Sequence, residues 1–407
     1  MTTPETRDAE VVIVGGGMVG MTLACALAGA GVEVAVIDRT APETQIMPAF
    51  DGRVSAIAHG SQQALAGIGL WPALAADAQP ILDIRVSDGD SPLFLHYDHR
   101  DLGAAPFGYI VENRHTRRAL FAAAERRARL CLVAPARLAA FERTAGGVVA
   151  RLEGGGRIRA RLAIAADGRK STMRRDAGIA VTTWRYPQIG IVCTVAHERP
   201  HRGVAHERFL PAGPFAILPM TGNRSSLVWT ERAALAPEIL ALGAADFGDE
   251  MARRFGDFLG RLEVVGPRWR YPLALSHAER YVAERLVLIG DAAHAIHPIA
   301  GQGLNLGLRD VAALAEVLVD ARRLGLDLGA GSHLVRYERW RRADSLALLA
   351  VTDGLNRLFS NDSAPVRLTR DLGLAAVDRI APLKRLFMRH AMGVVGDLPR
   401  LVRGESL

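Results

Sequence analysis

The sequence predicts an α/β protein in which buried strands and helices alternate at three separate places. Continuous apolar runs, suited to strands buried on both faces, lie at 11–14, 34–37, 162–166 and 286–289. The first and last of these lead through glycine-rich turns into long helical patterns. Short alternating segments at 81–98 and within 185–230, separated by proline and glycine, predict antiparallel strands. We therefore expect a parallel sheet with helices, a second β-rich region and helices at the C-terminal end.

The composition is that of a globular protein, with 49% hydrophobic and 23% charged residues in a chain of 407. The polar N-terminus and the lack of an 18-residue apolar run predict a cytoplasmic protein without a signal peptide or membrane span. Cys25, Cys131 and Cys193 are far apart, so we expect reduced thiols and no metal site. The net charge of +7 is almost wholly arginine, since Lys170 and Lys384 are the only lysines. We interpret it as a compositional bias, expect no nucleic-acid partner, and leave an anionic membrane surface as the alternative.

Residues 10–39 carry the pattern of a dinucleotide-binding turn. After the first strand come Gly15, Gly17 and Gly20 in the spacing GxGxxG, then a predicted helix over 18–30, a second strand and Asp38. The three glycines permit a tight turn, a close approach of the backbone to a pyrophosphate, and close packing of helix on strand. Asp38 can accept hydrogen bonds from an adenosine ribose. NAD and FAD both fit this pattern.

The strand at 162–166 ends at Asp167 and Gly168, and Ser171 is placed to cap a short helix after it. By itself this is also an ordinary strand-to-helix turn.

The stretch 284–318 is the most informative. A strand at 286–289 ends at Gly290 and Asp291, and Gly301-Gln302-Gly303 then opens a helix predicted over 304–324. Ligands bind at the carboxyl ends of strands in open α/β sheets. The unpaired N–H groups of a helix N-terminus would stabilise the negative charge of a reduced flavin ring. Asp291 is placed to bond a ribityl hydroxyl.

These three stretches resemble, in order, the three fingerprints of the class A FAD-dependent aromatic hydroxylases. Four segments are similar to the ubiquinone-biosynthesis subgroup: "DGRVSAIAHGS", "YIVENRHTRRAL", "GPFAILP" and "HPIAGQGLNLGLRD". Asp38 stands where many members have glutamate. The resemblance implies a p-hydroxybenzoate-hydroxylase-like fold, a Rossmann-like FAD-binding domain into which an antiparallel substrate sheet is inserted. We expect the FAD-binding domain at 1–80, 99–180 and 276–330, the substrate domain at 81–98 and 181–275, and a helical region at 331–407.

The implied activity is hydroxylation of a polyprenylated phenol by O2 in ubiquinone biosynthesis, through a C4a-hydroperoxyflavin. The implied electron donor is NAD(P)H or another reductant, although no second GxGxxG marks a domain for it. A quinone-biosynthesis complex is an implied partner. The alternatives are a hydroxylase of small phenols, a flavin-dependent prenyl reductase, and an FAD-binding scaffold without activity. A flavin halogenase is disfavoured because the WxWxIP motif is absent.

The resemblance places Arg53 over the flavin near the substrate, with a solvent-facing loop arginine as the alternative. Asn113 matches a position that touches FAD, and a plain helix N-cap is the alternative there. Arg53, Pro298 and Gly301 are assigned to positioning flavin and substrate. No acid or base is assigned, although His59, His294 and His297 lie near these motifs. The predicted cofactor-binding residues are Gly15, Gly17, Gly20, Asp38, Arg39, Arg53, Asn113, Asp167, Gly168, Gly290, Asp291, Pro298, Gly301, Gln302, Gly303, Leu304 and Asn305.

Two helical patterns follow, at 332–358 and 382–396. The second has a stripe of Leu383, Leu386, Phe387, Ala391 and Val394, with the cations Lys384, Arg385 and Arg389 largely off the stripe. Such a helix lies in a membrane interface or packs on the protein's own core. The pattern leaves both open, including a peripheral contact at the inner membrane.

Overall fold

A computed structural model describes residues 6–46, 50–89, 91, 94–296, 301–359, 370, 373 and 376–407. Its centre is a six-stranded sheet in the order β19-β20-β13-β2-β3-β9. The strands from β20 to β9 are parallel, and β19 runs antiparallel to β20 at the edge. Their bounds are β2 (Val11–Val14), β3 (Val34–Ile37), β9 (Leu130–Val133), β13 (Leu162–Ala165), β19 (Val282–Ala283) and β20 (Leu286–Leu288).

The helices of this half cover the sheet. The helix α1 (Met18–Gly29) packs against both α4 (Asn113–Glu125) and α8 (Gly303–Arg323). The strands β2, β3, β13 and β20 are buried along their whole length, as their continuous apolar sequences predict. The chain passes from β2 to β3 on one side and later returns to β13 on the other. This reversal at β2 creates a crevice at the carboxyl ends of β2 and β13.

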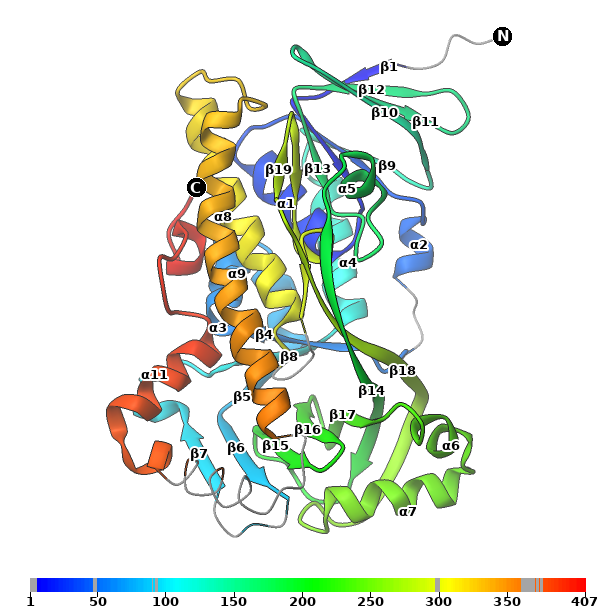
Figure 1. Cartoon of the computed structure of the whole chain (residues 1–407), viewed down its shortest axis with the longest axis vertical. Helices are drawn as coiled ribbons and strands as arrows, with labels where there is room; N and C mark the ends of the chain where they lie inside the picture. The colour runs from blue at the N-terminus through cyan, green and yellow to red at the C-terminus, as the bar shows by residue number, and fades with distance from the viewer. Residues whose placement is uncertain are drawn as a thin grey trace.

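A second sheet of eight strands has the order β21-β18-β14-β17-β16-β15-β6-β7. All neighbours are antiparallel except β15 and β6. Figure 1 shows that its long strands β14 and β18 begin or end beside the first sheet and run down to the other strands of the second sheet. The bounds are β6 (Asp83–Asp88), β7 (Phe94–Asp98), β14 (Val181–His197), β15 (Val204–Leu210), β16 (Gly213–Met220), β17 (Arg224–Arg232), β18 (Leu262–Ala278) and β21 (His294–Ala295).

One face of this sheet carries a separate core. Trp229 and Phe215 pack there with Phe247 and Phe255 of α7 (Ala244–Phe255), beside α6 (Ala236–Ala241). These two helices were not predicted, since the sequence indicated only strands in this region. The opposite face joins a core that includes Phe209, Tyr97 and residues of the C-terminal helices.

Two smaller sheets and several short helices complete the fold. The three-stranded sheet has the order β4-β8-β5, and the other has the order β1-β12-β11-β10. Their bounds are β1 (Thr6–Asp8), β4 (Val54–Ala58), β5 (Ala78–Ile81), β8 (Gly108–Glu112), β10 (Leu138–Thr144), β11 (Gly147–Leu152) and β12 (Arg157–Ala160). The short helices include α2 (Pro42–Gln45), α3 (His59–Gly67) and α5 (Thr172–Asp176).

The C-terminal region is helical. The helix α9 (Gly331–Phe359) lies along α8 and reaches the second sheet, and α11 (Ala381–Met392) lies beside its lower end (Figure 1). The predicted helix at 382–396 stops early because Gly393, at φ 73°, caps it in the left-handed conformation. Val394 is therefore not on the helix. The architecture confirms the predicted fold class.

Candidate active site

The first turn has the glycines that its geometry requires. Gly15 adopts φ 110°, and a Cβ at this position would overlap the carbonyl oxygen of Ala166. A Cβ at Gly20 would overlap the carbonyl oxygen of Gly15, because helix and turn are in contact there. At Gly17 a Cβ would meet nothing within 4 Å. The open side of the turn is thus at Gly17, where a phosphate can approach the N-terminus of α1.

Asp38 follows β3 and is fixed in front of this turn. Its carboxylate accepts hydrogen bonds from the backbone N–H groups of Gly16 (2.6 Å) and Thr40 (2.7 Å). The side chain of Gln45 donates a third, at 3.3 Å. The neighbouring Arg39 is exposed.

The second motif lies at the carboxyl end of β13, in contact with the first. Asp167 Oδ2 accepts hydrogen bonds from the backbone N–H groups of Thr172 (2.8 Å) and Met173 (3.3 Å), at the start of α5. Asp167 Oδ1 is buried and has no hydrogen-bond partner within the described chain. Ser171 caps α5, as predicted, by accepting from the N–H of Arg174 at 3.0 Å.

The third motif is held from behind by a buried ion network. Asp310 of α8 accepts hydrogen bonds from the N–H of Gly290 (2.9 Å), His294 Nε2 (2.7 Å) and Arg341 Nε (2.8 Å). Arg341 lies on α9 and also bonds Asp344 at 2.6 Å. Burial opposes ionisation of Asp310, but His294 and Arg341 outweigh it and hold its pKa below the ordinary value. The ion network therefore joins the Gly290 loop to α8 and α9.

Asp291 lies in front of this anchored loop. Its side chain is 51% exposed, and its carboxylate is 4.0 Å from the guanidinium of Arg169. It is thus free to meet a ligand in the crevice.

The N-terminus of α8 is clamped to β4. Asn305 Oδ1 accepts from the N–H of Ala58 at 2.9 Å, and its Nδ2 donates to the carbonyl oxygen of Ala56 at 2.9 Å. Gly301 has φ 62°, and a Cβ at this position would lie 3.0 Å from the Cβ of Ala56. The first N–H groups of α8, from Gly303 onward, have no intrahelical acceptor. Pro298 and His297 lie outside the described residues.

Arg53 is tied to its own loop. Its Nε donates to Asp51 Oδ2 at 2.7 Å, and its guanidinium lies 5.3 Å from the ring centroid of Trp269. The side chain is 36% exposed. It is not among the described residues that line the adjacent cavity. The carboxylate of Asp51 therefore neutralises part of the positive charge of Arg53.

Asn113 is the first residue of α4, and Glu112 occupies the N-cap position. The plain N-cap interpretation of Asn113 is therefore wrong. Its Oδ1 accepts a hydrogen bond from the hydroxyl of Ser55 at 2.7 Å, and its N–H donates to the carbonyl oxygen of Arg53 at 2.9 Å. It thus links α4 to β4 through Ser55 and to Arg53, the residue directly before β4.

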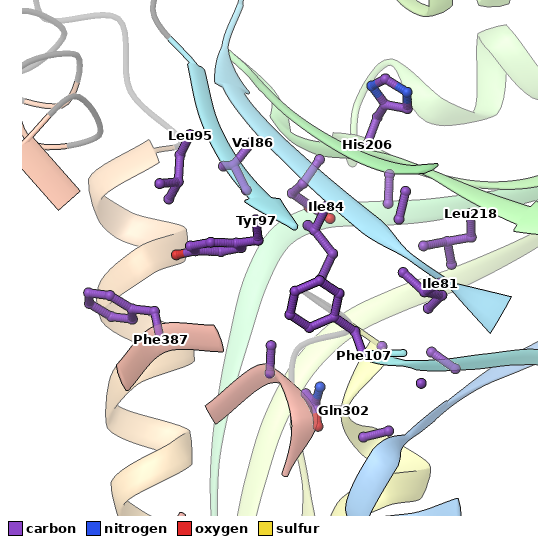
Figure 2. A pocket seen from close by; sticks show the side chains of 18 of the residues that line it. Ile81, Ile84, Val86, Leu95, Tyr97, Phe107, His206, Leu218, Gln302 and Phe387 are labelled. Atoms are coloured by element: carbon purple, nitrogen blue, oxygen red, sulfur yellow. The ribbon is translucent and has the colours of Figure 1, made fainter. Parts of the chain in front are cut away.

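An apolar cavity of about 450 Å³ lies between this region and the second sheet. Gly301, Gln302 and Asn305 line it on the α8 side. Figure 2 shows Gln302 below Phe107, and Tyr97 extending toward Phe387 of α11. The labelled apolar wall consists of Ile81, Ile84, Val86, Leu95, Phe107 and Leu218. The cavity therefore extends from the N-terminus of α8 to α11.

Comparisons with known proteins agree with this geometry. The family described as FAD binding domain matches residues 8–345. Ubiquinone hydroxylase UbiL of Rhodospirillum rubrum is 58% identical over 410 residues, covering 100% of this chain and 95% of that protein. The 3-demethoxyubiquinol 3-hydroxylase of Escherichia coli is 38% identical over 390 residues, covering 95% and 99%. The chain belongs to the family of FAD-dependent monooxygenases. The crystal structure of p-nitrophenol 4-monooxygenase PnpA from Pseudomonas putida shares the fold, with TM-score 0.81 at 20% identity over 97% of this chain and 99% of that one.

The residues of this FAD-dependent monooxygenase fit the cofactor that its family binds. The three motifs meet at one crevice. A Cβ at Gly15 would overlap the carbonyl oxygen of Ala166 in the second motif, and a Cβ at Gly290 in the third motif would lie 3.2 Å from Val19 on α1. The open side of Gly17 offers room for the pyrophosphate. The unpartnered Asp167 Oδ1 offers an acceptor at the same edge of the sheet.

Two residues of the site were missed by sequence reasoning. Asp310 was quoted within a motif but given no role, although an acid among the apolar positions of a helix is a signal for a buried partner. Glu207, on β15, lines the cavity and leaves Oε1 buried without a partner in the described part of the chain. Burial raises the pKa of Glu207 to about 8. The sequence signal for Glu207 was its place between Ala205 and Phe209 at alternate positions of one strand, which puts a charged residue on an apolar strand face.

Proposed function

We propose that this monooxygenase hydroxylates the aromatic ring of a polyprenylated phenol in ubiquinone biosynthesis, with the new oxygen taken from O2. The observation that carries this is the apolar cavity that begins at the N-terminus of α8 and extends to α11. Its size and lining suit an aromatic ring with part of an isoprenoid chain. The names of the relatives at 58% and 38% identity support the same substrate class.

Bound FAD supplies the redox and oxygen chemistry. The protein's own residues bind, orient and exclude water. Asp38, Asp167 and Asp291 would accept hydrogen bonds from cofactor hydroxyl groups or from water around the pyrophosphate. The N–H groups at Gly303 and Leu304 would stabilise negative charge on the flavin ring. The apolar wall keeps water away from the reacting atoms.

Arg53, Pro298 and Gly301 are proposed to position flavin and substrate. For Arg53 the support is its place directly before β4, whose residues Ala56 and Ala58 line the cavity. Its pairing with Asp51 means that it would act mainly by orientation and less by net charge. NAD(P)H or another reductant is the proposed electron donor.

We also propose a peripheral contact with a membrane surface, made by α11. Met388 and Met392 face the core, while Leu386 and Phe387 are 47% and 42% exposed. Arg385 and Arg389 are exposed beside them. Lys384 differs from the sequence expectation, because it is 17% exposed and bonds Asp378 at 3.0 Å. Phe387 also lines the cavity, so a substrate from the bilayer could enter here. The structure describes no helix long and apolar enough to cross a membrane.

The test is hydroxylation by purified protein under ¹⁸O2, with a prenylated phenol and a chemical or nicotinamide reductant. We expect one ¹⁸O atom, bonded to the ring of the product.

The variant Asp291→Ala should remain folded and lose most of its flavin, because one contact is removed from a preformed site. Equal turnover of unprenylated phenols would favour the small-phenol alternative, and reduction of the prenyl chain would favour the reductase. Absence of ring oxidation with bound FAD would contradict the proposal.

A further inference from the structure

Glu207 lies in the middle of the sheet face that forms the cavity wall. The residue paired with it on the neighbouring strand β16 is Ala216, and the residue paired with it on the other neighbour, β6, is Val86. Side chains alternate between the two faces of a strand, so Ala205, Glu207 and Phe209 share the cavity side. All five of these residues line the cavity. A carboxyl group is thus surrounded by an apolar surface.

The charged neighbours of Glu207 lie on the opposite face of the sheet or are paired with another residue. His206 borders the cavity, but its ring packs at a tilt against Phe258 with the ring centroids 4.6 Å apart, and Figure 2 shows the ring turned away from the cavity. Arg85 is the β6 partner of His206 and shares that opposite face. On the cavity side, Arg370 is bound to Asp88 at 2.8 Å. Burial is the cause of the raised pKa of Glu207, and no nearby charge contributes to it.

The other polar groups of the wall are engaged or lie at its ends. The side-chain amide of Asn305 is hydrogen-bonded to the backbone of Ala56 and Ala58 on β4. Tyr97 extends toward Phe387 at the α11 side (Figure 2). A buried polar group without a hydrogen bond is costly, and buried polar groups in proteins are rarely left unpaired. Glu207 Oε1 is such a group, since it is buried and accepts no hydrogen bond from the described part of the chain.

We propose that Glu207 binds an oxygen substituent on the aromatic ring of the substrate and so positions the ring in the cavity. This inference rests on the proposed function. A prenylated phenol carries its polar atoms on the ring and none on the chain, so the ring oxygen is the group that can satisfy this carboxyl. A neutral carboxyl both donates and accepts, and it therefore suits a hydroxyl or ether oxygen.

The experiment compares the binding of 2-geranylphenol and geranylbenzene to the FAD-loaded protein by calorimetry at pH 7. These two probes differ only in the ring hydroxyl. We expect wild type to bind the phenol about ten-fold more tightly, the effect of one buried hydrogen bond. Glu207→Leu should reduce this ratio to about one while retaining the binding of geranylbenzene. Glu207→Gln should keep a preference of several-fold, because an amide still donates and accepts.

Glu263→Gln is the matched control, since Glu263 is an exposed glutamate of β18 in the same sheet. It should keep the wild-type ratio. A ratio unchanged in Glu207→Leu, with geranylbenzene still bound, would overturn the assignment and leave the proposed function standing. Failure of wild type to bind either probe would overturn both.

Discussion

Two glycines of the first turn, three positions apart, have opposite surroundings. A Cβ at Gly17 meets open space, whereas a Cβ at Gly20 overlaps the carbonyl oxygen of Gly15. We expect Gly17→Val to lower FAD affinity at least about ten-fold, because it fills the space for the pyrophosphate, while destabilising the apoprotein by no more than about 1 kcal/mol. Gly20→Ala should destabilise the apoprotein by about 1–3 kcal/mol, as overpacking does. Flavin fluorescence titration and urea unfolding of the apoproteins measure the two effects.

Gly29→Ala is the control for this pair, because it lies at the end of the same helix and its Cβ would come no closer than 3.8 Å to Arg127. It should change neither quantity appreciably. Full FAD affinity in Gly17→Val would mean that the pyrophosphate does not approach this turn.

Asp310 accepts hydrogen bonds from Gly290 and His294 of the Gly290 loop and from Arg341 of α9, and so anchors that loop. Asp310→Asn leaves Arg341 buried without its main counter-charge, and breaking a buried ion pair in this way costs about 3–5 kcal/mol. We expect a loss of this size in the free energy of unfolding, measured with urea at saturating FAD, together with reduced flavin content. Asp320→Asn is the same substitution on the same helix, where Asp320 pairs with Arg400 near the surface. Its cost should stay below about 1 kcal/mol. Similar losses in both variants would contradict an anchoring role for Asp310.

At the scale of elements, the local sequence pattern was sufficient to predict the bounds of those strands and helices whose bounds depend on their own residues. The strands β2 and β3 match the predicted 11–14 and 34–37, and α8 and α9 begin and end within one residue of the expected positions. Glycine geometry and continuous apolar runs determine those segments. Asp310 meets Arg341 of α9, and Glu207 lies beside β6 in the cavity wall, so no local pattern could assign their roles. The same holds for α11, because amphipathic spacing does not tell which side meets the core.

The helix α11 gives an element-scale prediction. Leu386→Gln combined with Phe387→Gln should weaken co-sedimentation with anionic vesicles by at least about ten-fold, since each large apolar side chain contributes roughly 1.5–3 kcal/mol when buried. Arg385→Gln with Arg389→Gln should weaken it by about 1 kcal/mol per cation and make the remaining binding less sensitive to salt. Lys384 is left unchanged in both variants because it is engaged with Asp378.

Leu324→Gln is the control for this helix, since Leu324 is 74% exposed in the turn after α8, away from α11. It should sediment like wild type. Equal sedimentation of all variants, or none by wild type at low salt, would leave α11 as a helix that only packs on the protein.

At the scale of the whole molecule, buried titratable groups of opposite sign set how stability depends on pH. Burial lowers the pKa of His206 and of His277 to about 4, the second helped by His294. Between pH 6.5 and 4 the unfolded chain binds these protons and the folded chain does not, so these histidines make stability fall as the pH falls. Glu207 has a folded pKa of about 8, above its unfolded value, and acts in the other direction. Its contribution is fully present below about pH 4.5 and is lost as the pH rises toward 8.

Glu207→Gln should therefore change the pH dependence of the whole protein and not only its ligand binding. The amide does not titrate, so the free energy of unfolding of this variant should rise relative to wild type as the pH increases from about 4.5 to 8, by up to about 1.4 kcal/mol per pH unit. Above pH 8 the difference should become constant. Urea unfolding at pH 5, 6.5 and 8 with saturating FAD measures it, and the histidine contributions cancel because both proteins share them. Glu263→Gln, at an exposed position, should show a constant offset. The same constant offset in Glu207→Gln would mean that this carboxyl is already ionised in the folded cavity at neutral pH.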